Sequence, residues 1–192
     1  GTTAATTAST ARDAAVVASN ATSVKAVFDS AFVGAATGAG DNATSLTITG
    51  TKATSLEVVS GGANASNTLL YTGGDDATAA KGDLLTSVTI SGDRAVNFDY
   101  TAADATEITS INASALTGAL TFNLNDLKAT GTLTLGSGDD AITAQTGVAS
   151  GGTVAAMRAI SGIEKGTAEN STIQSNYDVI KLAGAVQAAD VA

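Results

Sequence analysis

Four side-chain types are missing from this 192-residue chain: cysteine, histidine, tryptophan and proline. Without cysteine there is no thiol nucleophile and no disulfide. Without histidine there is no Ser-His-Asp arrangement and no imidazole-ligated zinc, iron or haem. Any catalysis would have to use carboxylates, tyrosine or lysine. The lack of cysteine does not fix the redox compartment, but it is compatible with an extracellular protein.

Bulky side chains and basic charge are scarce. The chain has three Tyr, four Phe and one Met, and alanine supplies much of its 44% hydrophobic content. A wide globular core is hard to fill from these residues, whereas a narrow core of stacked Val, Ile and Leu suits them. Eighteen acidic against nine basic residues give a net charge of −9, which disfavours a nucleic-acid partner.

Long hydrophobic runs are also absent from the sequence. No run approaches the roughly 18 apolar residues that a membrane span needs, so no membrane insertion is expected. The sequence begins with Gly1, and no basic segment followed by an apolar one comes after it, so no secretory signal peptide is visible. We therefore expect a fragment or a processed form.

A repeat is the main structural signal in what is present. A small polar pair followed by an apolar residue recurs with a period of roughly 22 residues, within the range of repeat architectures. The recurring segments are Thr22-Ser23-Val24, Thr44-Ser45-Leu46, Ser66-Asn67-Thr68-Leu69, Thr86-Ser87-Val88 and Thr109-Ser110-Ile111. Looser copies follow at Thr132-Leu133, Thr153-Val154 and Thr172-Ile173.

A second family of short alternating segments lies between the first: Ser55–Val59, Val96–Tyr100, Leu120–Leu124 and Ala141–Thr143. Two short strands per period describe one coil of a β-solenoid. We therefore predict an all-β fold, a right-handed parallel β-helix or β-roll-like solenoid with coils of about 22 residues. The alternative is that a Thr/Ser/Ala/Gly-rich chain produces such matches by chance.

Two segments do not follow the alternating pattern of a strand. The residues at helical spacing in the first are Val24, Val27, Phe28 and Phe32. A short helix that caps one end of the solenoid therefore competes with a strand between about Ala11 and Val33, and the same holds for Val154–Ile163. We expect residues 1–40 to form an Ala/Thr-rich segment with a possible cap, and residues 41–192 the solenoid, as one continuous domain.

The sharpest short motif is Gly136-Ser137-Gly138-Asp139-Asp140-Ala141-Ile142-Thr143. It fits G-x-G-x-D-x-U-x, the greater part of the calcium-binding nonapeptide of RTX proteins, with Leu135 in place of the first Gly. Glycine lets the turn point its carbonyls at a cation, Asp140 supplies a hard oxygen beside Asp139, and Ile142 anchors the following strand. The alternative is an ordinary solvated Gly-Asp-Asp turn.

Weaker relatives of this motif are Gly73-Gly74-Asp75-Asp76-Ala77 and Gly38-Ala39-Gly40-Asp41-Asn42-Ala43. Stacked strands lie about 4.8 Å apart, so aligned carboxylates would repel and a bridging Ca²⁺ would reverse the repulsion. The candidate ligands of Ca²⁺ are therefore Gly136, Gly138, Asp139, Asp140, Asp75, Asp76, Asp41 and Asn42. Tandem nonapeptides share each ion between coils, and this chain has one good copy, so incomplete sites are expected.

Other chemistries fit the sequence less well. Glycoside hydrolysis needs two acids facing each other across a groove with aromatic platforms, and aromatics are scarce, so we expect no enzyme activity. Segments such as Thr47-Ile48-Thr49 resemble those of ice-binding solenoids, but their spacing is irregular and threonine is a good strand residue. Sequons at Asn20, Asn42, Asn64, Asn112 and Asn170 are glycan acceptors if the source is eukaryotic.

Five segments together resemble bacterial S-layer and RTX-type surface proteins: Leu85–Asp93, Ile111–Leu120, Gly136–Ile142, Ile160–Glu164 and Tyr177–Leu182. The resemblance spans about residues 40 to 182. It implies type I export without a cleaved N-terminal signal, calcium-triggered folding outside the cell, and lattice or adhesive assembly.

We therefore expect an extracellular structural protein, a calcium-dependent self-assembling module of a surface layer. Its expected partners are other copies of itself or cell-surface polysaccharide. The alternative is a module of a type I-secreted RTX adhesin that binds glycan or a host surface. A third possibility is a calcium-stabilised spacer between other domains.

Overall fold

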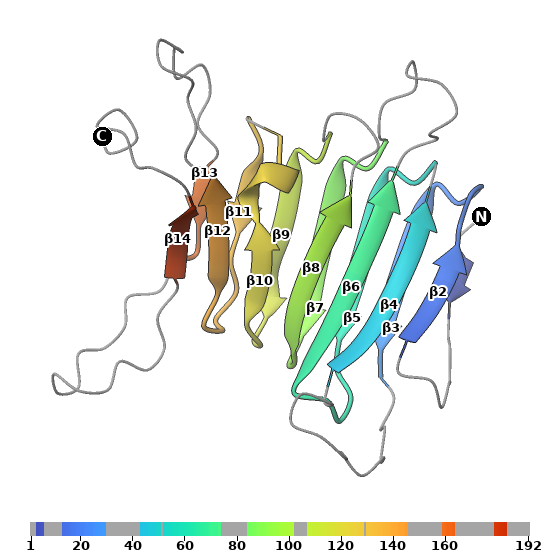
Figure 1. Ribbon diagram of the computed structural model, residues 1–192, viewed down its shortest axis with the longest axis horizontal. Helices are drawn as coiled ribbons and strands as arrows, with labels where there is room; N and C mark the ends of the chain where they lie inside the picture. Colours follow the sequence, from blue (N-terminus) through green and yellow to red (C-terminus); the bar gives the residue numbers. More distant parts are fainter. Residues whose placement is uncertain are drawn as a thin grey trace, which may run out of the picture.

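Two β-sheets form the body of the protein in the computed structural model (Figure 1). The structure describes residues 3–5, 13–29, 43–50, 52–73, 84–101, 107–128, 130–145, 159–163 and 179–183.

The strands fall into two sets. Sheet A contains β1 (Thr3–Ala5), β3 (Ser23–Phe28), β5 (Ser55–Ser60), β7 (Ser87–Gly92), β9 (Ser110–Leu116), β11 (Thr132–Thr134) and β13 (Ala159–Ser161). Sheet B contains β2 (Asp13–Val17), β4 (Ala43–Gly50), β6 (Ser66–Gly73), β8 (Ala95–Thr101), β10 (Leu120–Asn123), β12 (Ala141–Gln145) and β14 (Val179–Ala183). One 3₁₀ turn, η1 (Leu124–Asp126), follows β10.

Successive strands alternate between the two sheets. The order in sheet A is β1-β3-β5-β7-β9-β11-β13, and in sheet B it is β14-β12-β10-β8-β6-β4-β2. The described pairings are parallel. We call an odd-numbered strand and the even-numbered strand after it a coil, so that β1 and β2 form coil one and β13 and β14 form coil seven. The predicted all-β fold of stacked parallel strands is confirmed.

The inward side chains of each sheet form columns along the stack. Alternate residues of a strand point to opposite faces, and parallel pairing places each residue over its partner in the next coil. The first inward column of sheet A consists of Val24, Leu56, Val88, Ile111 and Leu133, all buried. The narrow core of stacked aliphatic residues expected from the composition is therefore present.

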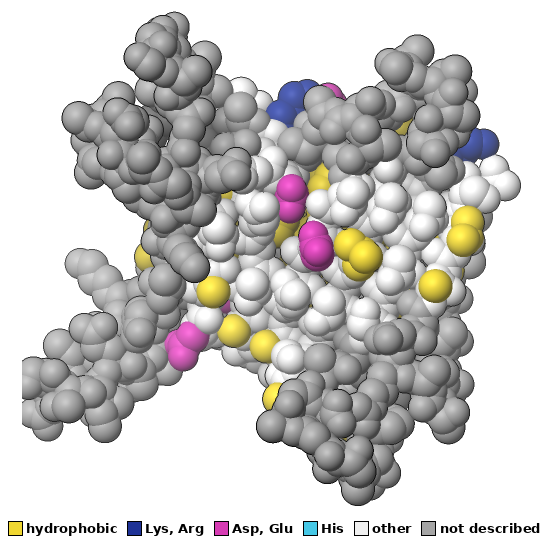
Figure 2. Space-filling view, in the orientation of Figure 1, with side chains coloured by type: hydrophobic (Ala, Val, Ile, Leu, Met, Phe, Trp, Pro, Cys, Tyr) yellow, Lys and Arg dark blue, Asp and Glu magenta, His cyan; other side chains and the backbone are white. Residues whose placement is uncertain are grey.

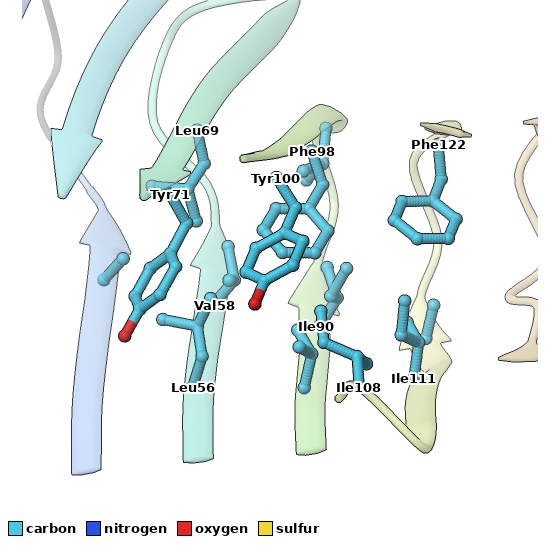
Figure 3. Close-up of a cluster of buried hydrophobic side chains, with 14 of the residues drawn as sticks. Leu56, Val58, Leu69, Tyr71, Ile90, Phe98, Tyr100, Ile108, Ile111 and Phe122 are labelled. Atoms are coloured by element: carbon cyan, nitrogen blue, oxygen red, sulfur yellow. The ribbon is translucent and has the colours of Figure 1, made fainter. Parts of the chain in front are cut away.

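Aromatic rings fill the matching columns of sheet B. The ring centroids of Phe98 and Phe122 lie 5.8 Å apart with an interplanar angle of 11°, and those of Tyr71 and Tyr100 lie 6.1 Å apart at 22°. Figure 3 shows these rings facing aliphatic side chains of sheet A, among them Val58. Among the described aromatic residues, Tyr71, Phe98, Tyr100 and Phe122 thus lie buried between the two sheets in coils three to five.

The helix considered for Ala11–Val33 is wrong for the part of that segment that the structure describes. Asp13–Val17 is β2 and Ser23–Phe28 is β3. The helical spacing misled because the inward position between Val24 and Phe28 belongs to Ala26, which is fully buried, while Val27 is partly exposed. Phe32 lies outside the described residues.

The same correction applies to Val154–Ile163, because Ala159–Ser161 within it is β13. Both sheets include strands that precede residue 40, since β1 pairs with β3 and β2 pairs with β4. Described strands on either side of residue 40 thus belong to the same two sheets.

The coils do not keep the constant length that the repeat predicted. Phe122 of β10 pairs with Ile142 of β12, and Ile142 pairs in turn with Ile180 of β14. The second of these two steps along the sequence is nearly twice as long as the first. Despite this difference, β10, β12 and β14 stay in register along sheet B.

The first family of repeated segments predicted from the sequence contains strands of both sheets. The segments at Leu46 and Leu69 belong to sheet B, whereas the segment at Val88, taken as the same family, belongs to sheet A. The sheet A counterpart of Val88 in coil three is Leu56, which the repeat had placed in the second family. The strands were predicted, but their distribution between the sheets was not.

Replacing Phe98 by alanine tests the aromatic column. Phe98 is 1% exposed and stacks on Phe122, so we expect the free energy of unfolding to fall by about 3–5 kcal/mol in urea denaturation. The control is Asn97→Ala on the same strand, where the side chain is exposed and the change should stay within about 0.5 kcal/mol. Equal losses in the two variants would contradict a stabilising role specific to the inward column.

Candidate functional site

The Gly136–Asp140 segment forms the connection between β11 and β12, where the chain passes from sheet A to sheet B. It lies against the corresponding connection of coil five, because the backbone N–H of Ser137 donates to the carbonyl of Leu116 at 3.1 Å. The N–H of Leu135 donates to the carbonyl of Ser161 in coil seven at 2.8 Å. We call such a connection from one sheet to the other a corner. The motif thus forms a corner that packs between the corners of the two neighbouring coils.

The glycines of the motif allow this close approach. A Cβ on Gly136 would lie 2.0 Å from the Leu116 carbonyl oxygen, and one on Gly138 would lie 2.3 Å from the Gly118 carbonyl oxygen. Both contacts are with backbone, which cannot rotate away. Neither residue is among the described glycines with positive φ, which include Gly92 at 120°. Gly136 and Gly138 are therefore required by space, not by a left-handed conformation.

Asp140 faces the interior of the stack. It is 0% exposed, and its Oδ1 accepts a hydrogen bond from the backbone N–H of Leu120 at 2.7 Å. It directly precedes Ala141, which pairs with Thr121, so Asp140 occupies the position over Leu120 in the inward column. Asp139, by contrast, is exposed. The two carboxylates of the motif lie on opposite sides of the backbone.

This arrangement does not bring the carboxylates of Asp139 and Asp140 together on one side, and calcium binding at Gly136, Gly138, Asp139 and Asp140 stays a prediction. Calcium takes about six to eight oxygen ligands from one surrounding shell. Here one carboxylate is enclosed and accepts from a backbone N–H, while the other points to solvent. In the part of the chain that the structure describes, no three or more Asp, Glu, His or Cys side chains gather into a group that could hold a metal.

The other candidate ligands, Asp75, Asp76, Asp41 and Asn42, lie outside the described residues. In sequence, the first pair falls between β6 and β7, on a connection from sheet B to sheet A. The second pair falls between β3 and β4, on a connection in the opposite sense. Calcium binding at these four residues stays a prediction.

A second buried corner residue, Asn67, was missed by the sequence reasoning. It is 1% exposed, and its Nδ2 donates to Ser60 Oγ at 2.9 Å and to the Gly61 carbonyl at 3.1 Å. The available signal was the alternation along β6, which puts Asn67 on the same side as the buried Leu69 and Tyr71. An amide on the inward side of a strand has to find its hydrogen bonds within the protein.

The opposite corner, from sheet B to sheet A, carries a ladder of threonines. Both the N–H and the Oγ1 of Thr54 donate to the Thr22 carbonyl, at 2.9 and 3.2 Å. Thr86 makes the same two contacts with Thr54, at 3.0 and 3.1 Å, and Thr109 makes them with Thr86, at 2.8 and 3.1 Å. The Thr-Ser repeat seen in the sequence coincides in part with this ladder, which links coils two to five.

A shallow open hollow of about 410 Å³ lies on the outer face of sheet A. Its polar lining residues are Ser23, Lys25, Ser55, Glu57, Ser87 and Thr89. Lys25 Nζ and Glu57 Oε1 form an ion pair of 2.8 Å whose side chains are 40% and 48% exposed. Hydroxyl groups and one ion pair are thus offered to solvent across three adjacent strands.

The outer face of sheet B is similar in character. Figure 2 shows it mostly in white, the colour of uncharged polar side chains and backbone, with scattered hydrophobic and acidic side chains. One outward column of this face consists of Ser45, Thr68, Asn97 and Thr121. The described helical structure is limited to η1, and none of it is long and apolar enough to cross a membrane.

No protein-family model matches this chain, and neither the search of curated proteins nor the search of solved structures returned a match.

Replacing Gly138 by alanine tests the packing of the corner. The new Cβ would collide with the Gly118 carbonyl, so we expect a loss of about 1–3 kcal/mol in the free energy of unfolding, measured by denaturant titration. The matched control is Ser137→Ala in the same connection, where the side chain is exposed and little should change. A neutral Gly138→Ala would mean that the two corners are free to separate.

Proposed function

We propose that this chain is a structural module of an extracellular surface layer that joins other copies of itself end to end. The observation that carries the proposal is the state of the two ends of the stack. Among the described strands, β1 and β2 have one neighbour each at one end, and β13 and β14 have one neighbour each at the other. A strand edge carries backbone N–H and C=O groups that can pair with another chain.

The two ends would fit each other with the same parallel pairing that joins the coils. In a parallel stack, the strands at the two ends expose opposite edges. A copy added head to tail would therefore continue both sheets. Such a heterologous contact, repeated along the axis of the stack without a rotation that closes a ring, produces an open array. This geometry supports a filament, which could form a row within a layer, more than a closed oligomer.

Apolar groups at the ends favour the same contact. Val16 of β2 and Ile160 of β13, at opposite ends, pack against the core and are only partly buried. Ile163, just after β13, is 50% exposed. A further coil placed over either end would remove this apolar surface from water, which is favourable.

The net negative charge should make assembly depend on salt concentration. Copies carrying a net charge of −9 repel one another, and salt weakens that repulsion. Calcium would weaken it further, and the calcium dependence of assembly stays a prediction that depends on Asp41, Asn42, Asp75 and Asp76.

We also propose that the stack is a right-handed parallel β-helix. Each strand is followed by a strand of the other sheet before the chain returns to pair in parallel with the first, and crossovers between parallel strands are right-handed in nearly all proteins. An experimentally phased crystal structure with left-handed coils would contradict it.

A pair of lysine variants tests end-to-end assembly. Val16→Lys and Ile160→Lys each place a charge at one end of the core, so each variant should remain monomeric in light scattering at concentrations where the unmodified chain assembles. Mixed together, they should form a discrete heterodimer, because one free end of each kind remains. The controls are Val17→Lys and Ser161→Lys, adjacent exposed positions on the same strands, which should assemble normally.

Two outcomes would overturn the proposed assembly. One is an unmodified chain that stays monomeric with and without calcium at high concentration. The other is a mixture of folded Val16→Lys and Ile160→Lys chains that contains monomers alone. Circular dichroism of each variant separates a blocked end from an unfolded protein.

The hollow on sheet A favours a second function, binding of a surface polysaccharide. Its lining includes the hydroxyls of Ser55 and Ser87 and the Lys25–Glu57 ion pair, and these groups can exchange hydrogen bonds with sugar hydroxyls. The absence of an aromatic residue from its described lining predicts weak affinity per site, compensated by repetition in an array.

Ser55→Arg tests this second function. The arginine would fill the hollow, so binding to an immobilised polysaccharide, measured on a glycan array, should fall at least about tenfold, or about 1.4 kcal/mol. Ser161→Arg is the control, an exposed serine of the same sheet outside the hollow. Glycan binding that is unchanged in Ser55→Arg, or absent in the unmodified chain, would remove the hollow from consideration.

A further inference from the structure

We propose that Asp140 is an internal clamp that joins coils five and six without a cation, so that the segment matching the calcium nonapeptide folds in the absence of calcium. The clamp stabilises a corner of the stack, whereas the proposed assembly uses its two ends. The letters of the motif match a calcium site, but its second carboxylate lies inside the protein.

The register places this carboxylate in a core column. The inward column at the start of sheet B runs through Asn67, Val96 and Leu120, which are 1%, 1% and 0% exposed. Asp140 continues this column in coil six, since the next residues, Thr121 and Ala141, are paired. A carboxylate in this column lies between the sheets, away from the solvent side of the corner where an ion would enter.

The hydrogen-bond partner of the carboxylate belongs to the neighbouring coil. Leu120 begins β10, and its N–H donates to Asp140 Oδ1 at 2.7 Å, at the short end of the range for an N–H···O hydrogen bond. This bond connects the corner of coil six directly to the first strand residue of coil five. Oδ1 is thus engaged by the backbone of the preceding coil.

Asn67 shows an independent use of the same position. It stands in the same inward column, and its amide donates to Ser60 Oγ and to the Gly61 carbonyl across its own corner. An amide cannot act there through charge, so a short polar side chain at this position holds the corner by hydrogen bonding. Asp140 repeats that role between two coils.

The corner also leaves little space for an ion. Gly136 and Gly138 approach the preceding corner so closely that even a methyl group would overlap the carbonyl oxygens of Leu116 and Gly118. The Leu116 oxygen also accepts from the N–H of Ser137. An ion bridging the two corners would have to separate them, because calcium holds its oxygens at about 2.3–2.6 Å from itself.

Melting temperatures in excess calcium and in chelator test the clamp, for the unmodified chain, Asp140→Asn and Asp140→Ala. Asparagine keeps an oxygen for the Leu120 N–H, whereas alanine leaves that buried donor without its acceptor. In chelator we therefore expect Asp140→Ala to melt about 3–8 °C lower than the unmodified chain and Asp140→Asn to melt between the two. The matched control is Asp139→Ala, the exposed neighbour, which should melt as the unmodified chain does.

The decisive quantity is the calcium increment, the melting temperature in calcium minus that in chelator. A clamp predicts the same increment in the unmodified chain, Asp140→Asn and Asp139→Ala, whatever calcium does elsewhere in the chain. An increment that disappears in Asp140→Asn would overturn the proposal, as would an Asp140→Ala that matches the unmodified chain in chelator. Because none of these variants alters an end of the stack, failure here is distinguishable from failure of assembly.

Discussion

Backbone pairing between parallel strands of successive coils is the constraint on which the rest of the structure depends. It fixes each residue over its partner in the next coil, as Val88 lies over Leu56, so side chains at one position share one environment along the stack. Large apolar side chains in an inward column fill the narrow core. A polar side chain in such a column has to find its hydrogen bonds inside the protein. At the same corner of different coils, Asn67 Nδ2 donates to Ser60 Oγ and to the Gly61 carbonyl, and Asp140 Oδ1 accepts from the Leu120 N–H.

The same pairing explains the composition of the corners. At the passage from sheet A to sheet B, consecutive connections approach so closely that Gly138 lies against the Gly118 carbonyl, and a side chain larger than hydrogen has no room. At the passage from sheet B to sheet A, the hydroxyl and N–H of Thr86 share the carbonyl of Thr54. A chain rich in glycine and threonine therefore needs neither proline nor disulfides to define these turns, because each coil provides the template for the next.

The fold class could be predicted because period-two alternation depends on local geometry alone, and it appears in most of the described strands. The distribution of strands between the sheets could not, because Leu46 and Leu56 both follow a serine and begin a similar alternation while lying in different sheets. Their assignment follows from the pairing of each strand with its neighbours in the stack, which alternation alone does not specify. The helix expected near Val24 failed for a related reason: Ala26 is small enough to be overlooked as an inward residue, yet it is fully buried.

The sequence motif at Gly136–Thr143 does not by itself distinguish a cation site from a hydrogen-bonded corner. The letters of G-x-G-x-D-x-U-x specify a close turn, a carboxylate and a buried anchor, and both a cation site and a clamp use all three. What separates them is how far the alternation extends back from the anchor. Ile142 is buried, Ala141 exposed, Asp140 buried and Asp139 exposed, so the alternation of β12 continues past its first residue and turns the carboxylate inward. The aspartate stands two positions before its anchor, and in extended backbone that spacing places both on one face. The corner therefore places its acid in the core column, where the backbone of the preceding coil supplies the donor.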